Sequence, residues 1–139
     1  MSTTIRPEVS KRRIYWISKH RFYELKHFCL QYKDWKKELN DISLSSYHAL
    51  DGKVHTKSSG INDPVFDSVA RRELLTDRMN MVKKAADTCS EDLGTYVFKG
   101  VTEGTSYERL FLQNGIPCCK DTYYEAFRRF FWILSKLRK

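Results

Sequence analysis

The C-terminal segment 120–137 carries apolar side chains at helical spacing, and this pattern constrains the fold more than any other. Tyr123, Phe127, Phe130, Leu134 and Leu137 recur at steps of four, three, four and three residues. Side chains at this spacing form one continuous stripe on an α-helix. The segment is therefore expected to be an amphipathic helix whose aromatic stripe packs against the rest of the chain.

A shorter helix is expected directly before it. Tyr107 and Leu110 lie three residues apart, and Thr105 or Ser106 can accept a backbone N–H as the N-cap. This helix is expected to stop at Asn114-Gly115, because glycine takes the left-handed conformation that ends helices at little cost and Pro117 has no N–H with which to continue one. Two helices joined by a short turn make the pattern of a helix-turn-helix.

The longer helix carries polar side chains opposite its apolar stripe. If its first turns entered the major groove of DNA, those side chains would meet base edges. We therefore expect base contacts from Lys120, Asp121, Tyr124, Glu125 and Arg128. The alternative is a helix that closes a bundle and exposes these side chains to water.

These C-terminal residues resemble the RinA/ArpU type of phage late-gene transcriptional activators. The resemblance rests on residues 107–112, the turn 114–117 and the run 121–131, and extends more faintly to 64–86 and 29–35. It implies a helix-turn-helix similar to the promoter-reading unit of sigma factors. Double-stranded DNA and RNA polymerase would then be the partners.

The charge of the chain is positive and unevenly spread. The net charge is +8; residues 1–40 hold ten Lys and Arg against four acids, and 116–139 hold six against two. Two basic ends favour contact with a polyanion, although the surplus could also serve solubility alone. Phosphate contacts are expected from Lys11, Arg12, Arg13, Lys99, Arg129, Lys136 and Arg138.

The rest of the chain predicts an all-α fold in three parts. Residues 1–42 read as a basic arm and a helical hairpin, with Ser18 as an N-cap. The Ser- and Gly-rich segment 43–62 lacks a sustained period and reads as a flexible polar loop. Residues 63–139 read as a helical domain: a long helix from Pro64 and then the helix-turn-helix. The long helix leaves a coiled-coil homodimer open as an alternative.

A further short helix is expected between these two parts. The run Ser90-Glu91-Asp92 is placed to cap it, and Gly100 is expected to end it. The helix would run through Leu93, Tyr96, Val97 and Phe98. This helix would lie against the first helix of the DNA-binding unit.

The motifs of common enzyme classes are absent, and we expect no catalysis. The sequence has no GxSxG, HExxH, P-loop or GxGxxG motif. The four cysteines lack zinc-ligand spacing, so no metal or other cofactor is expected. No apolar run is long enough to span a bilayer, which favours a protein that stays inside the cell and has no membrane partner. The resemblance to phage activators implies that this is the cytoplasm of a bacterial host cell.

Together these patterns favour a DNA-binding transcriptional regulator, an activator, of phage or prophage origin. One alternative is a phage-encoded inhibitor of a host nucleoprotein, such as an anti-CRISPR protein bound to a CRISPR effector. Another is a small terminase subunit.

Overall fold

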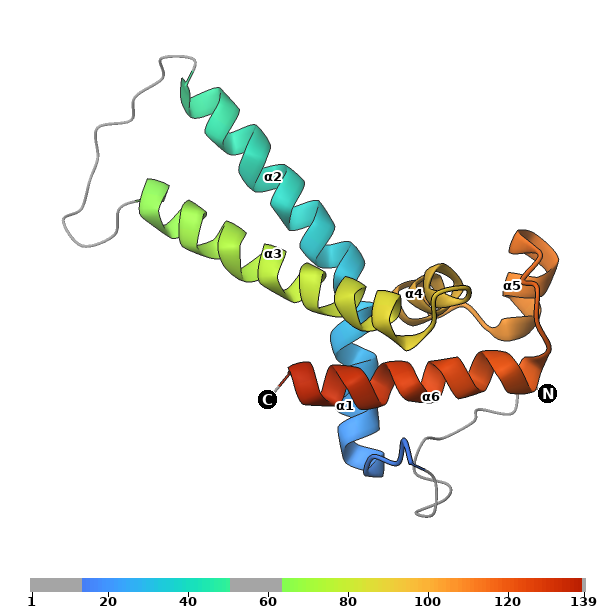
Figure 1. Ribbon diagram of the computed structural model, residues 1–139. Helices are drawn as coiled ribbons and strands as arrows, with labels where there is room; N and C mark the ends of the chain where they lie inside the picture. The colour runs from blue at the N-terminus through green and yellow to red at the C-terminus, as the bar shows by residue number, and fades with distance from the viewer. Residues whose placement is uncertain (1–13, 51–63, 139) are drawn as a thin grey trace.

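The computed structural model describes residues 14–50 and 64–138, and within them the chain forms six helices and no strand (Figure 1). The predicted all-α fold is confirmed. The helices are α1 (Lys19–Leu30), α2 (Tyr32–Leu50), α3 (Pro64–Cys89), α4 (Gly94–Glu103), α5 (Tyr107–Asn114) and α6 (Lys120–Leu137).

Helix α6 lies at the centre of the packing. It contacts α1, α3 and α4, and Figure 1 shows it crossing α1 below the C-terminal half of α3. The predicted stripe is buried at Tyr123, Phe130 and Leu134, whereas Phe127 and Leu137 are half-buried. Phe131, outside that stripe, is buried too. The buried face is wider than predicted because α6 has neighbours on several sides.

The N-terminal hairpin is present as α1 and α2, which Gln31 alone separates. Helix α1 begins where Ser18 Oγ accepts the N–H of Arg21 at 3.4 Å, as expected of an N-cap. From Gln31, α2 runs to lie beside α3, where the Glu38 carboxylate and the Arg71 guanidinium pair at 2.7 Å.

The predicted start of the polar loop at residue 43 is wrong, because α2 continues to Leu50. Serine is only modestly worse than alanine in a helix interior, and packing against another element overrides a difference of this size. Helix α2 has such a neighbour in α3. The remainder of the expected loop, 51–62, lies outside the described residues.

Helix α3 begins at Pro64 as predicted, and α4 follows it after a short turn. In this turn Ser90 Oγ accepts the N–H of Leu93 at 3.1 Å. Helix α4 passes through Gly100, the expected end, and stops at Gly104, which has φ +68°. Gly100 is instead a contact position, because a methyl group there would overlap the hydroxyl oxygen of Tyr123.

The burial of α6 predicts a large stability loss on truncation. Phe130 is fully buried, so Phe130→Ala is expected to lower the free energy of unfolding by about 3–5 kcal/mol in urea titrations. The control is Phe111→Ala on α5, where the ring is 56% exposed; its cost should stay below about 0.5 kcal/mol. Similar costs for the two variants would show that the stripe is not the core.

A second prediction concerns Gly100 and Tyr123. The Tyr123 hydroxyl is buried and finds no hydrogen-bond partner within the described part of the chain. Removing such a group with Tyr123→Phe is expected to raise the free energy of unfolding, by about 1 kcal/mol. Gly100→Ala should destabilise the wild type through the clash with the hydroxyl. In the Tyr123→Phe background it should stabilise, because alanine favours helices.

The wild type, the two single variants and the double variant form a double-mutant cycle, and their free energies of unfolding are compared in urea. Substitutions of residues in contact show a coupling energy, whereas the effects of substitutions at independent sites add within about 0.5 kcal/mol. Additive effects of Gly100→Ala and Tyr123→Phe would contradict the contact.

Candidate nucleic-acid interface

Helices α5 and α6 and the turn between them form the predicted helix-turn-helix. Ser106 Oγ accepts the N–H of Arg109 at 3.3 Å, and Gly115 ends α5 with φ +61°. Leu110 and Ile116 are both buried. The sequence signals for these two helix ends are therefore confirmed, and the turn is anchored in the core.

Three contacts across the turn fix the start of α6 relative to α5. The Tyr107 hydroxyl donates to the Cys118 carbonyl at 2.6 Å, and its ring lies 5.8 Å from that of Tyr123. The Lys120 ammonium pairs with the Glu108 carboxylate at 2.9 Å. The first turn of α6 is held by apolar, neutral polar and ionic contacts together.

The first turns of α6 expose a mixed-charge face. Asp121, Thr122, Glu125 and Arg129 are exposed, and Tyr124 is half-buried. Of the five predicted base-contact residues, Asp121 and Glu125 therefore lie on this face. Tyr124 is at its edge, and Lys120 is engaged by Glu108. We call the four exposed residues the α6 face.

The fifth predicted reader, Arg128, is not on the exposed side of the helix. Arg128 is only 7% exposed, and its Nη2 donates to Glu125 Oε2 at 2.6 Å. One turn further along, the Trp132 ring packs against Tyr15, which precedes α1, at 5.3 Å between centroids. The segment before α1 thus lies along this side of α6, a tertiary contact that helical periodicity does not reveal.

The predicted phosphate contacts are dispersed. Arg129 is exposed, whereas Lys99 donates to Asn114 Oδ1 at 2.9 Å. The Lys136 ammonium lies 3.5 Å from the centroid of the Trp132 ring, about 24 Å along α6 from its first residue at the usual helical rise. Three more candidates lie outside the described residues: Lys11, Arg12 and Arg13.

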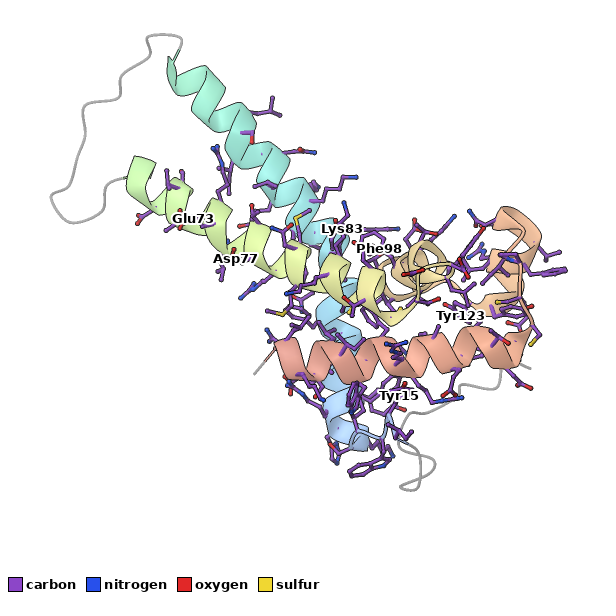
Figure 2. All side chains as sticks on the ribbon, in the orientation of Figure 1. Tyr15, Glu73, Asp77, Lys83, Phe98 and Tyr123 are labelled. Atoms are coloured by element: carbon purple, nitrogen blue, oxygen red, sulfur yellow. The ribbon has the colours of Figure 1, made fainter. Side chains whose placement is uncertain are left out.

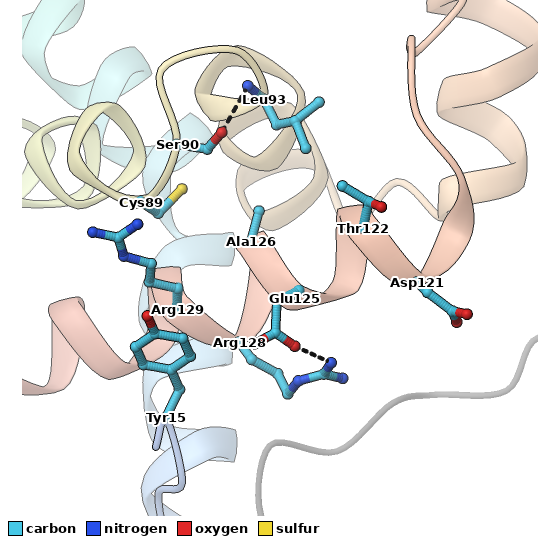
Figure 3. A pocket seen from close by; sticks show the side chains of 10 residues that line it. All are labelled: Tyr15, Cys89, Ser90, Leu93, Asp121, Thr122, Glu125, Ala126, Arg128 and Arg129. Atoms are coloured by element: carbon cyan, nitrogen blue, oxygen red, sulfur yellow. Dashed lines mark hydrogen bonds and ion pairs between the residues drawn. The ribbon is translucent and has the colours of Figure 1, made fainter. Parts of the chain in front are cut away.

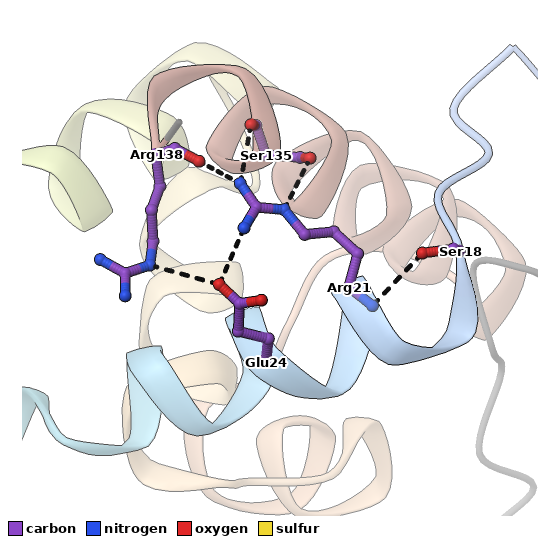
Figure 4. Close-up of polar contacts among 5 residues, drawn as sticks. All are labelled: Ser18, Arg21, Glu24, Ser135 and Arg138. Carbon is purple, nitrogen blue, oxygen red and sulfur yellow. Dashed lines mark hydrogen bonds and ion pairs between the residues drawn. The ribbon is translucent and has the colours of Figure 1, made fainter.

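Arg138, the last of these candidates, has a structural role at the end of α6 (Figure 4). Its carbonyl accepts from the guanidinium of Arg21, which also donates to the carbonyl of Ser135 at 3.0 Å. The Arg138 guanidinium stacks 3.9 Å from the Phe28 ring centroid and lies 3.8 Å from the Glu24 carboxylate. It ties α6 to α1.

A pocket with a volume of about 830 Å³ has the four residues of the α6 face in its wall (Figure 3). Its walls come from three separate segments: Tyr15 before α1, Ser90 and Leu93 between α3 and α4, and the first half of α6. Sequence reasoning missed this pocket because no local pattern places Tyr15 or Ser90 beside α6.

Two adjacent thiols lie directly before the N-terminus of α6, and their environments differ. Cys119 is exposed, and the hydrogen bond between its sulfur and Thr122 Oγ1 at 3.1 Å lowers its pKa. Partial burial raises the pKa of Cys118. Burial raises the pKa of Cys89 in the core to about 12. All four cysteines are free thiols.

Comparison with known proteins gives no relative. No family model matches the chain, and no match was found among curated proteins or solved structures. Within residues 14–50 and 64–138 no group of His, Cys, Asp and Glu is arranged to hold a metal ion. None of the helices described there is long and apolar enough to cross a membrane.

The thiol environments predict an order of modification. A lowered pKa raises the thiolate fraction at any pH below the usual value, and the thiolate is the nucleophile. Iodoacetamide at pH 7.5 should therefore alkylate Cys119 before Cys118, and Cys89 only on unfolding, as followed by peptide mass spectrometry. Thr122→Val removes the hydrogen bond, so it should raise the pH at which Cys119 is half-reactive. Faster alkylation of Cys118, or an unchanged midpoint, would contradict this account.

Proposed function

We propose that the protein is a DNA-binding regulator of transcription that reads double-stranded DNA with α5 and α6. The observation that carries the proposal is the α6 face: exposed polar side chains on the first turns of a helix whose other side is core. A reading helix needs both properties, because base discrimination requires side chains held in a fixed position. The resemblance to phage late-gene activators supports a phage or prophage origin, activation, and action in the bacterial cytoplasm.

The chemistry of the α6 face suits discrimination more than affinity. Carboxylates such as Asp121 and Glu125 can accept from the amino group of cytosine but are repelled by phosphates. Arg129 can donate to guanine or to a phosphate. Affinity must then come from basic side chains elsewhere, in keeping with the net charge of +8.

The test is selection of duplexes from a randomised pool, followed by titration of the selected duplex and a scrambled one. Asp121→Asn and Glu125→Gln remove the charge but keep the shape, and each should lower the discrimination between the duplexes by about 1–3 kcal/mol. Matched controls are Asp77→Asn and Glu73→Gln, exposed on α3 away from the α6 face (Figure 2). They should leave discrimination unchanged.

Two results would count against the proposal. One is failure to enrich any duplex sequence. The other is an equal loss of discrimination in the α6-face variants and the α3 controls. Removing a charge from a base-reading face must lower discrimination, whereas removing a charge elsewhere on the surface must not.

A second candidate is an inhibitor of a host nucleoprotein, such as an anti-CRISPR protein. It is favoured by the exposure of Phe111 and Leu112 on α5, 56% and 83%, because large apolar side chains in the open suit a protein partner. The same surface could instead contact RNA polymerase. Phe111→Ser with Leu112→Ser separates the two functions: duplex discrimination should persist, whereas an inhibitor would lose its activity.

A further inference from the structure

The pocket beside the α6 face contains a buried donor with no acceptor. Arg128 is almost fully buried, and its Nε–H has no hydrogen-bond partner among the residues that the structure describes. Its Nη2 is already engaged by Glu125. A buried donor left unpaired destabilises the protein, and more so when the group is charged. Arg128 lines the pocket, and its Nε–H, which solvent does not reach, becomes available to an incoming acceptor when the guanidinium turns toward the opening.

Further donors line the same space. Arg129 is exposed and forms no hydrogen bond or ion pair with the described residues. Ser90 Oγ accepts from the N–H of Leu93, so its own O–H remains available to donate. The Tyr15 hydroxyl adds a donor from the segment before α1. Figure 3 shows that these side chains come from separate segments around one opening.

The charge of the pocket limits which acceptor it suits. Arg128 and Arg129 face Asp121 and Glu125 around it, so their formal charges cancel. A phosphomonoester carries a charge of about −1.5 to −2 at neutral pH, and the carboxylates disfavour so much negative charge. A phosphodiester carries a single negative charge, which the donors can satisfy without a large net field.

The size of the pocket and its apolar wall also fit a phosphodiester. The volume of about 830 Å³ exceeds one phosphate and leaves room for an attached sugar. Leu93 and Ala126 supply an apolar wall for it. A repeating chain of monoanionic phosphates and sugars is the backbone of a nucleic acid.

We propose that this pocket binds one phosphodiester group of the DNA backbone, held by Arg129, Ser90 and the Nε–H of Arg128. The inference rests on the proposed function and adds to it the place where one strand passes the protein. The phosphate contact positions the α6 face, and the face then reads the bases.

The test compares Arg129→Gln with Arg71→Gln in the full chain. Arg71→Gln removes the same charge from α3, where Arg71 pairs with Glu38. Losing one phosphate contact reduces the slope of log Kobs against log salt by about 0.9. Arg129→Gln should therefore show this reduction on the selected and the scrambled duplex alike, and Arg71→Gln should keep the wild-type slope.

The second measurement follows the side-chain Nε–H signal of Arg128 by NMR. Duplex DNA should shift this signal in the wild type and in Arg71→Gln, whereas inorganic phosphate at the same phosphate concentration should not. Ser90→Ala should weaken binding to both duplexes by the same factor.

The outcomes separate the two proposals. A wild type that binds no duplex overturns both of them. Duplex binding with an unchanged slope in Arg129→Gln and an unshifted Arg128 signal overturns the phosphodiester site alone. A signal that inorganic phosphate shifts but duplex DNA does not would make the pocket a small-anion site and would likewise overturn the inference.

Discussion

The burial of the aromatic face of α6 against α1, α3 and α4 is the interaction on which the rest of the structure depends. Phe130, Phe131 and Leu134 are enclosed by helices from both halves of the chain. Burying a side chain of this size contributes about 1.5–3 kcal/mol, so a few of them provide much of the stability of a small domain. The same contacts fix the direction in which the first turns of α6 point.

The candidate site follows from that placement. The turn before α6 is held by the hydrogen bond from Tyr107 to Cys118, and Gly100 lets α4 approach Tyr123 closely. The exposed side chains of Asp121 and Glu125 therefore project from a helix that cannot rotate without breaking the core. A face fixed in this way suits the recognition of a rigid partner, and duplex DNA is one.

How far the sequence predicted this arrangement depends on the range of the contact. Local signals succeeded: Ser18 and Ser106 cap helices, Gly115 ends one, and the stripe is buried at Tyr123, Phe130 and Leu134. Contacts between distant segments were missed. The burial of Arg128, the pocket with Ser90 and the contact of Gly100 with Tyr123 each depend on a neighbour far away in the chain. Periodicity along one helix carries no information about such neighbours.

The most direct test of the account is an NMR map of backbone amide shifts as a selected duplex is added to the labelled protein. The account predicts that the largest changes fall on residues 120–129 and on Ser90, while the exposed end of α3 around Glu73 stays unchanged. Changes confined to α2 and α3, or to Phe111 and Leu112 on α5, would contradict it, because the reading surface would then lie elsewhere.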